Sequence, residues 1–194
     1  FEFVSCLLIF IPLIILSLVL AVLIKIDSPG GVLYTQARIG RHKKPFQLIK
    51  FRTMVNNSQE VLEEMLKDPE IKRQWKKYHK IENDRRITRI GKWIRKFSLD
   101  ELPQLINILR GEMSLIGPRP YMQSEIDEVG EAADLIFEGR PGLTGWGRGN
   151  GGNDLSFAER TQLDLFYVYN WSLWLDLFIF IKTFWVMIFD RSGK

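Results

Sequence analysis

The chain contains very little cysteine and histidine, and that scarcity narrows the chemistry open to it. Cys6 is the only cysteine, and His42 and His79 are the only histidines among 194 residues. A lone cysteine inside an apolar run excludes an internal disulfide and a cysteine-ligated metal site. Two histidines fit poorly with a histidine zinc site or a Ser-His-Asp triad. Any metal is therefore expected to be a hard cation held by carboxylate and phosphate oxygens, which points to Mg²⁺.

An initiator methionine and an excess of acidic residues are also missing. The chain begins with Phe1, so we expect it to be a piece of a longer polypeptide, and its length suits about one domain at ~150 residues each. Lysine and arginine number 27 against 23 acidic residues, which gives a formal net charge of +4. This balance favours an anionic partner: membrane lipid, nucleic acid or a phosphorylated substrate.

One long apolar run lies at the start of the chain. Residues 3–24 form an uncharged stretch of 22 residues, which is long enough to cross a bilayer. Lys25 ends the run and several bases follow it closely, so the chain beyond is predicted to lie in the cytoplasm. Pro12 removes a helical hydrogen bond and predicts a kink. The pattern favours a spanning anchor, and a helix that turns and leaves on the side it entered is the alternative.

The middle of the chain is typical of an α+β fold that is mostly helical. Residues 31–38 and 46–54 alternate in polarity around a basic loop, which predicts a β-hairpin. Residues 58–78 have a charged helical pattern that is interrupted at Asp68 and Pro69. A proline at this point predicts two short helices rather than one.

Further helices and a loop are predicted in the second half. Bases at helical spacing predict a helix over 85–96, and another is expected over 101–109 before a glycine. Residues 139–152 contain seven glycines and are expected to form a loop. The aromatic segment 163–189 is interrupted by charges, so we interpret it as amphipathic helices lying in a membrane interface. A buried pair of aromatic helices is the alternative.

Two adjacent carboxylates follow the most basic stretch of the chain. Residues 85–96 hold six bases and no acid, and Asp100 and Glu101 come directly afterwards. Ser98 and Glu101 match a capping box, which would be a purely structural role at a helix start. Capping accounts for one carboxylate and not for two, and phosphoryl transfer needs a carboxylate beside phosphate-binding cations. Both interpretations of the pair stay open on the sequence pattern.

Several bases are candidates for binding phosphate. Arg119 lies between two prolines, which restrict its backbone and aim a guanidinium whose planar fork suits a phosphate. Lys50 and Arg52 are two residues apart on the predicted second strand and therefore share a face. Each base taken alone is more often a solvated surface charge. Their accumulation near an acidic pair favours a phosphate site.

Taken together, five motifs resemble the bacterial sugar transferases, the monotopic phosphoglycosyl transferases. They occur in family order along the chain and read KFRTM (50–54), SLDELPQLINILRGEMSLIGPRP (98–120), RPGLTG (140–145), NDLSF (153–157) and NWSLWLDL (170–177). The resemblance implies transfer of a sugar 1-phosphate from a UDP-sugar to polyprenyl (undecaprenyl) phosphate, with release of UMP. It also implies that the product begins O-antigen, capsule, exopolysaccharide or glycoprotein glycan assembly.

The same resemblance implies roles for individual residues. Asp100 would be the nucleophile that forms a phosphosugar intermediate, and Glu101, with Asp100 beside it, would associate with Mg²⁺. The remaining positions that the resemblance connects with the substrate phosphates are Lys50, Arg95, Arg119 and Asp164. A segment rich in glycine departs from the family pattern, because Gly152 stands where the family has a final arginine and Arg148 is the only base there.

The resemblance also implies a membrane arrangement. The family has a re-entrant helix broken at a Ser-Pro pair, whereas this chain has Pro12 as its only proline in the run. We therefore expect a re-entrant or kinked helix over 1–26, a cytoplasmic catalytic domain over 27–162 and interfacial helices with a tail over 163–194. The expected location is the cytoplasmic face of the bacterial inner membrane, in contact with phospholipid.

Two other classes of function compete with a transferase. A scaffold that binds anionic lipid would use the basic and aromatic surfaces, but it would not need adjacent acids or an arginine between prolines. Binding to nucleic acid is disfavoured, because the apolar run and the lack of a recognised nucleic-acid module both oppose it. Assembly into an oligomer is left open by the sequence.

Overall fold

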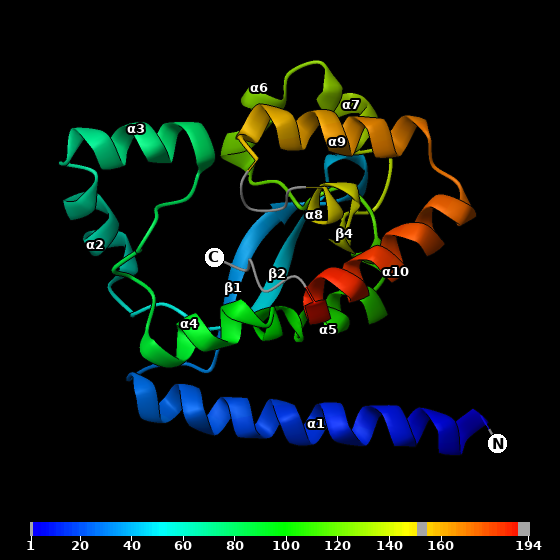
Figure 1. The fold of residues 1–194 in the computed structure, drawn as a ribbon, viewed down its shortest axis with the longest axis horizontal. Coiled ribbons are helices and arrows are strands. Elements are labelled where there is room, and N and C mark those ends of the chain that lie inside the picture. Colours follow the sequence, from blue (N-terminus) through cyan, green and yellow to red (C-terminus); the bar gives the residue numbers. More distant parts are fainter. Residues whose placement is uncertain (1, 151–154, 190–194) are drawn as a thin grey trace.

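Two antiparallel strands form the centre of the molecule in the computed structural model, which describes residues 2–150 and 155–189 (Figure 1). Strand β1 (Leu33–Ile39) pairs with β2 (Pro45–Phe51), and Tyr34 lies opposite Lys50 in the register. The predicted hairpin is therefore confirmed. It forms because alternating side chains pack on its two faces while the basic loop stays in solvent.

Helix α1 (Glu2–Asp27) is continuous and contains Pro12 without an interruption in the helix. It lies along one side of the molecule beneath α4 and α5 (Figure 1). Leu20 and Ile24 pack with Phe51 and Ile94, which joins the end of α1 to the hairpin and to α4. The expected re-entrant turn is not shown. Among the residues that the structure describes, no helix meets the length and apolarity needed to cross a membrane.

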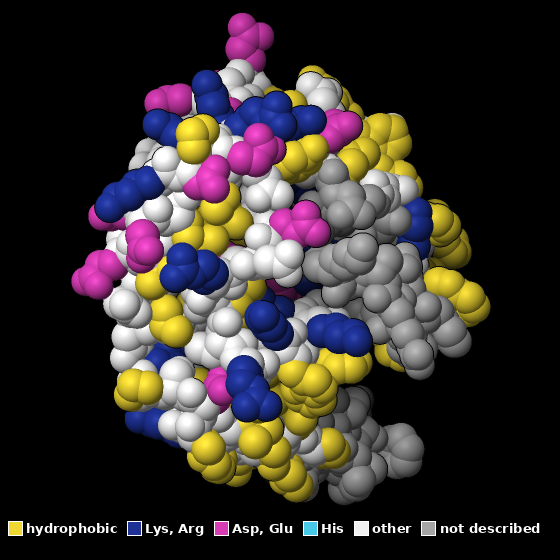
Figure 2. Space-filling model, turned by 60° about the vertical axis from the view of Figure 1, so that its left-hand side comes forward, with side chains coloured by type: hydrophobic (Ala, Val, Ile, Leu, Met, Phe, Trp, Pro, Cys, Tyr) yellow, Lys and Arg dark blue, Asp and Glu magenta, His cyan; other side chains and the backbone are white. Residues whose placement is uncertain are grey.

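The charged segment after the hairpin forms α2 (Ser58–Met65) and α3 (Pro69–Tyr78), as predicted from the break at Asp68. The Asp68 side chain accepts a hydrogen bond from the Glu70 N–H and caps α3, with Pro69 in its first turn. Leu62, Met65 and Ile81 form a small core under these helices. Charged side chains of both signs cover the face that carries α2 and α3 (Figure 2).

Helix α4 (Arg89–Lys96) begins later than predicted. Thr88 caps it by accepting a hydrogen bond from the Gly91 N–H, so Arg85 and Arg86 lie in the preceding turn and not on the helix. Any side chain at Gly91 would collide with the Thr53 carbonyl. Glycine at this position therefore allows α4 to lie directly on the chain that leaves β2.

The helix predicted over 101–109 was also placed too early. A short 3₁₀ turn, η2 (Leu99–Glu101), precedes α5 (Gln104–Leu109). Ser98 adopts a left-handed φ of 54°, and its hydroxyl makes no capping bond. The capping-box interpretation was therefore wrong, because the Glu101 N–H donates to the Ser98 carbonyl and not to its side chain.

Short elements follow α5 and close the fold above the hairpin. They are β3 (Ser114–Ile116), the 3₁₀ turn η3 (Gln123–Glu125), α6 (Ile126–Val129), α7 (Ala132–Ile136), β4 (Gly142–Thr144) and α8 (Trp146–Gly149). Strands β3 and β4 pair in parallel. The prediction of a loop throughout 139–152 was wrong in this part, because β3 provides a partner strand that local sequence does not reveal.

Helices α9 (Phe157–Tyr169) and α10 (Leu173–Phe189) end the described chain. Helix α9 begins before residue 163 and buries Phe157 in a core with Tyr121, Ile136 and Phe137. Helix α10 instead exposes many large apolar side chains, namely Leu173, Trp174, Leu177, Phe178, Phe180, Ile181, Phe184 and Trp185. The alternative interpretation, a buried pair of aromatic helices, therefore holds for one face of α9 and does not hold for α10.

Candidate active site

The acidic pair lies where α4, α5 and the hairpin meet. Turn η2 carries Asp100 and Glu101 to the face of β2 from which Lys50 projects. The Lys50 ammonium lies 3.6 Å from Glu101 Oε1 and 4.0 Å from Asp100 Oδ2. Asp100 is buried, with 9% of its surface exposed. Residues that are distant in sequence thus form one small cluster of opposite charges.

Arg148 completes this cluster from the other side. Its Nη1 donates to Glu101 Oε2 at 2.7 Å and to the Leu143 carbonyl at 3.2 Å. Its Nη2 lies 3.3 Å from the Ser98 hydroxyl oxygen, within hydrogen-bonding distance. Arg148 was not among the predicted site residues. The available signal was a single base inside a segment rich in glycine.

The environment separates the pKa values of the two adjacent carboxyls. Burial raises the pKa of Asp100, with Lys50 opposing and Glu101 reinforcing the rise. Burial alone would also raise the pKa of Glu101, but Arg148 and Lys50 outweigh it and lower that pKa. Neighbouring carboxyls whose pKa values are pushed apart are suited to two different roles in one reaction.

Arg95 contributes positive charge from α4. Its Nε donates to the Thr53 hydroxyl at 2.9 Å, a contact that the close approach at Gly91 makes feasible. Burial lowers the pKa of Arg95, and the nearby Asp100 and Asp84 oppose that effect. The guanidinium is therefore held near the acidic pair without a direct ion pair to it.

Arg119 and Asp164 lie together in a second polar cluster. The Arg119 N–H donates to Asp164 Oδ2 at 3.2 Å, and the Tyr121 hydroxyl donates to the same oxygen at 2.6 Å. The Arg119 guanidinium pairs with buried Glu125 at 2.8 Å, and Arg38 lies 3.6 Å from the same carboxylate. These contacts link both residues to the core rather than to Asp100.

Burial raises the pKa of Asp164 to about 6, although Tyr121 and Arg119 favour its charged form. The Nη1 of Arg119 is buried and has no hydrogen-bond partner among the described residues. Glu125 was missed by the sequence analysis because it is one acid among several in an unremarkable polar segment. Its importance arises from its nearly complete burial, with 1% of its surface exposed.

Arg52, the remaining predicted phosphate-binding residue, contacts the end of α1. It donates to the carbonyls of Pro29 and Ser28 and to the Asn56 side chain. Two backbone carbonyls and one side-chain amide oxygen thus accept hydrogen bonds from its two Nη atoms. Arg52 fixes the turn after α1 to the hairpin, and the structure does not bring it to the acidic pair.

The carboxylate oxygens of Asp100 and Glu101 are ligands of the kind that a hard divalent cation prefers. Within the described part of the chain, no group of three or more histidine, cysteine, aspartate or glutamate side chains is arranged to hold a metal. Mg²⁺ commonly needs only one or two protein carboxylates, because water and substrate phosphates complete its coordination. Asp100 and Glu101 offer such oxygens.

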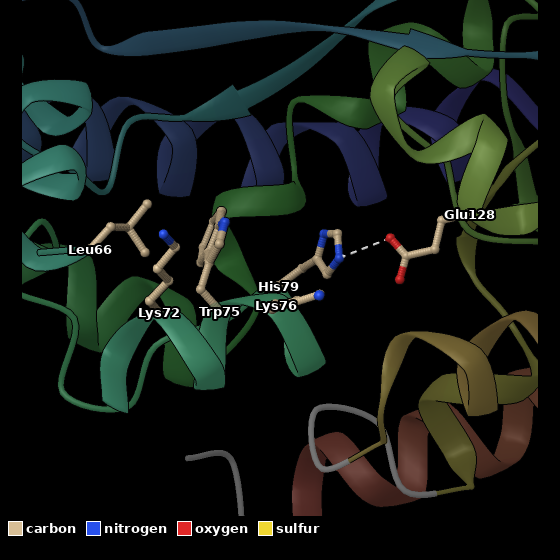
Figure 3. A pocket seen from close by; sticks show the side chains of 6 residues that line it. All are labelled: Leu66, Lys72, Trp75, Lys76, His79 and Glu128. Atoms are coloured by element: carbon tan, nitrogen blue, oxygen red, sulfur yellow. Dashed lines mark ion pairs between the residues drawn. The ribbon is translucent and has the colours of Figure 1, made fainter. Parts of the chain in front are cut away.

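A separate cleft of about 380 Å³ lies beside α3 (Figure 3). Its lining residues are Leu66, Lys72, Trp75, Lys76, His79 and Glu128. His79 Nε2 lies 3.1 Å from the Glu128 carboxylate (Figure 3). None of these residues comes from η2, β2 or α8, so this cleft is distinct from the acidic pair.

Comparison with known proteins gives the acidic site a family context. A sequence model described as bacterial sugar transferase matches residues 1–190. The chain is 46% identical over 184 residues to the UDP-galactose-lipid carrier transferase of Erwinia amylovora, covering 94% of this chain and 38% of that protein. It is 46% identical over 171 residues to the undecaprenyl-phosphate galactose phosphotransferase of Salmonella typhimurium, covering 87% and 36%.

A shorter relative is covered over most of its length. The exopolysaccharide production protein ExoY of Rhizobium meliloti is 44% identical over 188 residues, covering 96% of this chain and 82% of that protein. The chain thus spans less than half the length of the first two relatives and most of the third.

Proposed function

The chain belongs to the bacterial sugar transferase family, and we propose that it moves a sugar 1-phosphate from a UDP-sugar to polyprenyl phosphate. The observation that carries the proposal is the buried Asp100 beside Glu101, with Lys50 and Arg148 around them. A carboxylate nucleophile divides one displacement into two easier ones. The names of the relatives support lipid-linked phosphate as the acceptor class.

In the first proposed step, an oxygen of Asp100 attacks the phosphorus that bears the sugar. The bond between that phosphorus and the bridging oxygen breaks, UMP leaves, and an acyl phosphate joins the sugar phosphate to Asp100. In the second step, a phosphate oxygen of the lipid attacks the same phosphorus and the Asp100 carboxylate leaves. Every bond formed in one step is balanced by one broken.

Surrounding cations have a defined task in both steps. Lys50 and Arg95 place positive charge beside Asp100, where negative charge moves between phosphate oxygens. Nη1 of Arg119 has no hydrogen-bond partner among the described residues, and this spare donor suits the guanidinium to a further phosphate oxygen of a substrate. Glu101 and Asp100 would hold Mg²⁺, which when bound neutralises phosphate charge.

We further propose that the apolar faces of α1 and α10 lie against the cytoplasmic side of the bacterial inner membrane. The exposed apolar residues of α1 include Ile14, Ile15, Leu18, Val19, Val22 and Ile26. Contiguous apolar surface of this kind on two helices is typical of contact with lipid. Such contact would bring the lipid phosphate to the height of the acidic pair.

The test is transfer of label from a panel of radiolabelled UDP-sugars into lipid that organic solvent extracts. Asp100→Asn should lower transfer at least ~10³-fold and abolish the labelled protein intermediate, as expected on removal of a nucleophile. Asp134→Asn is the matched control, because Asp134 is an exposed acid on α7 with 84% of its side chain accessible. An Asp100→Asn variant that keeps more than about a tenth of the activity contradicts the mechanism. Binding to anionic vesicles without transfer from any UDP-sugar would favour the scaffold instead.

A further inference from the structure

Glu101 is the more heavily neutralised member of the acidic pair. Each of its two oxygens faces a different cation: Lys50 lies 3.6 Å from Oε1 and Arg148 lies 2.7 Å from Oε2. Asp100 has only the longer contact of 4.0 Å to Lys50 among the ion pairs of the described residues. Arg148 therefore holds its oxygen more closely than Lys50 holds the other, and a further cation on Glu101 would have to share the carboxylate with both bases.

Arg148 reaches Glu101 from a segment that α10 holds in place. Trp146 stacks on Phe166 and lies 6.0 Å from the ring of Phe178 on α10. Lys182, also on α10, donates to Asn150 at 2.8 Å. A side chain at Gly147 would meet nothing within 4 Å, so the backbone beside Arg148 borders open space. Helix α8 is therefore anchored at both ends by α9 and α10, while the Arg148 side chain keeps 31% of its surface accessible.

We infer that Arg148 is a positioning residue that occupies Glu101 as a resident cation and competes there with a divalent metal ion. This inference rests on the proposed function. A metal ion on the same carboxylate would lie within about 5 Å of the guanidinium, where like charges repel strongly even at an effective dielectric constant near ~20. The Arg148 guanidinium must then leave Oε2. The phosphates of the incoming UDP-sugar are anions to which it can donate hydrogen bonds instead.

Metal binding in the absence of donor tests this inference directly. Free Mn²⁺ can be measured by its electron paramagnetic resonance signal in a titration of the full chain in detergent. Arg148→Gln should bind Mn²⁺ at least ~10-fold more tightly than wild type, because one repelling charge has been removed. The gain should vanish in the double variant Arg148→Gln with Glu101→Gln. Arg73→Gln is the matched control, since Arg73 is an exposed arginine on α3, with 79% of its side chain accessible.

Other variants keep the result interpretable. Arg148→Met removes the same charge and should tighten Mn²⁺ binding as Arg148→Gln does. It therefore serves as a second neutral variant if Arg148→Gln folds poorly. Arg148→Lys retains a charge and should stay nearer wild type. Unchanged or weaker Mn²⁺ binding in both neutral variants, with native circular dichroism, overturns the inference.

The proposed function is measured separately through transfer by the wild type. If transfer occurs and the neutral variants gain no Mn²⁺ affinity, the inference fails and the function stands. If no UDP-sugar supports transfer, the proposed function is refuted. If the neutral variants nevertheless gain Mn²⁺ affinity and this gain depends on Glu101, the competition between Arg148 and the metal is supported. Absence of Mn²⁺ binding in every variant, with or without UDP-sugar, also overturns the inference.

Discussion

Replacing Asn107 with alanine should destabilise the fold and disturb the acidic pair together. Asn107 is completely buried and connects α5 to the outer edge of β2. Its Oδ1 accepts the Ile49 N–H at 3.1 Å, while its Nδ2 donates to the Gln47 carbonyl and to Glu112, both at 2.7 Å. Strand β2 carries Lys50, and α5 begins at Gln104, shortly after Glu101.

The magnitude follows from the groups that would lose their partners. Alanine removes three hydrogen bonds and deprives the Ile49 N–H and the Gln47 carbonyl of the side chain that pairs with them. Each buried polar group left unsatisfied costs about 1–3 kcal/mol, so we expect the free energy of unfolding to fall by about 3–5 kcal/mol. A shift of β2 relative to η2 should also lower transfer by about tenfold or more, since small misplacements of catalytic groups are costly.

The assay is chemical denaturation in detergent followed by far-ultraviolet circular dichroism, with transfer measured on the same preparations. Asn170→Ala is the control, because Asn170 is exposed and, among the described residues, its side chain donates only to the Phe166 carbonyl at the end of α9. That change should cost less than about 0.5 kcal/mol. A loss below about 1 kcal/mol for Asn107→Ala would refute the reasoning, because it would mean that the partners of Asn107 are readily satisfied by water.

Chelation by EDTA should abolish transfer and added Mg²⁺ should restore it, and full activity in the chelator would contradict the proposed metal. Asp164 has a folded pKa of about 6 against an ordinary 3.8, so its contribution to stability is present below about pH 4 and lost as pH rises through 6. Between pH 4 and 7.5 the wild type should lose up to about 3 kcal/mol relative to Asp164→Asn in denaturation experiments, and parallel pH profiles would contradict this. Single cysteines can be placed near Phe1 and near Lys25 in a Cys6→Ala background and labelled in oriented vesicles with an impermeant thiol reagent. Both should label from the same side if residues 3–24 re-enter the cytoplasm. Labelling from opposite sides would mean that the helix spans.

Local patterns in the sequence determined the elements whose formation depends on neighbouring residues. Alternating polarity around a basic loop was enough to predict the hairpin, and Asp68 followed by Pro69 was enough to separate α2 from α3. Five motifs in family order, among them the one around Asp100, were enough to identify the family. These predictions succeeded because strand alternation, helix capping and proline geometry act over a few residues.

Tertiary structure alone decided the features that depend on distant partners. The 3₁₀ turn at the acidic pair follows from the left-handed Ser98, and β4 exists because β3 lies beside it. Only the fold brings Arg148 to Glu101, directs Arg119 to Glu125 and turns Arg52 toward the end of α1. A charged side chain takes its partner from whatever the packed backbone places within a few ångströms, and spacing along the chain carries no record of that distance.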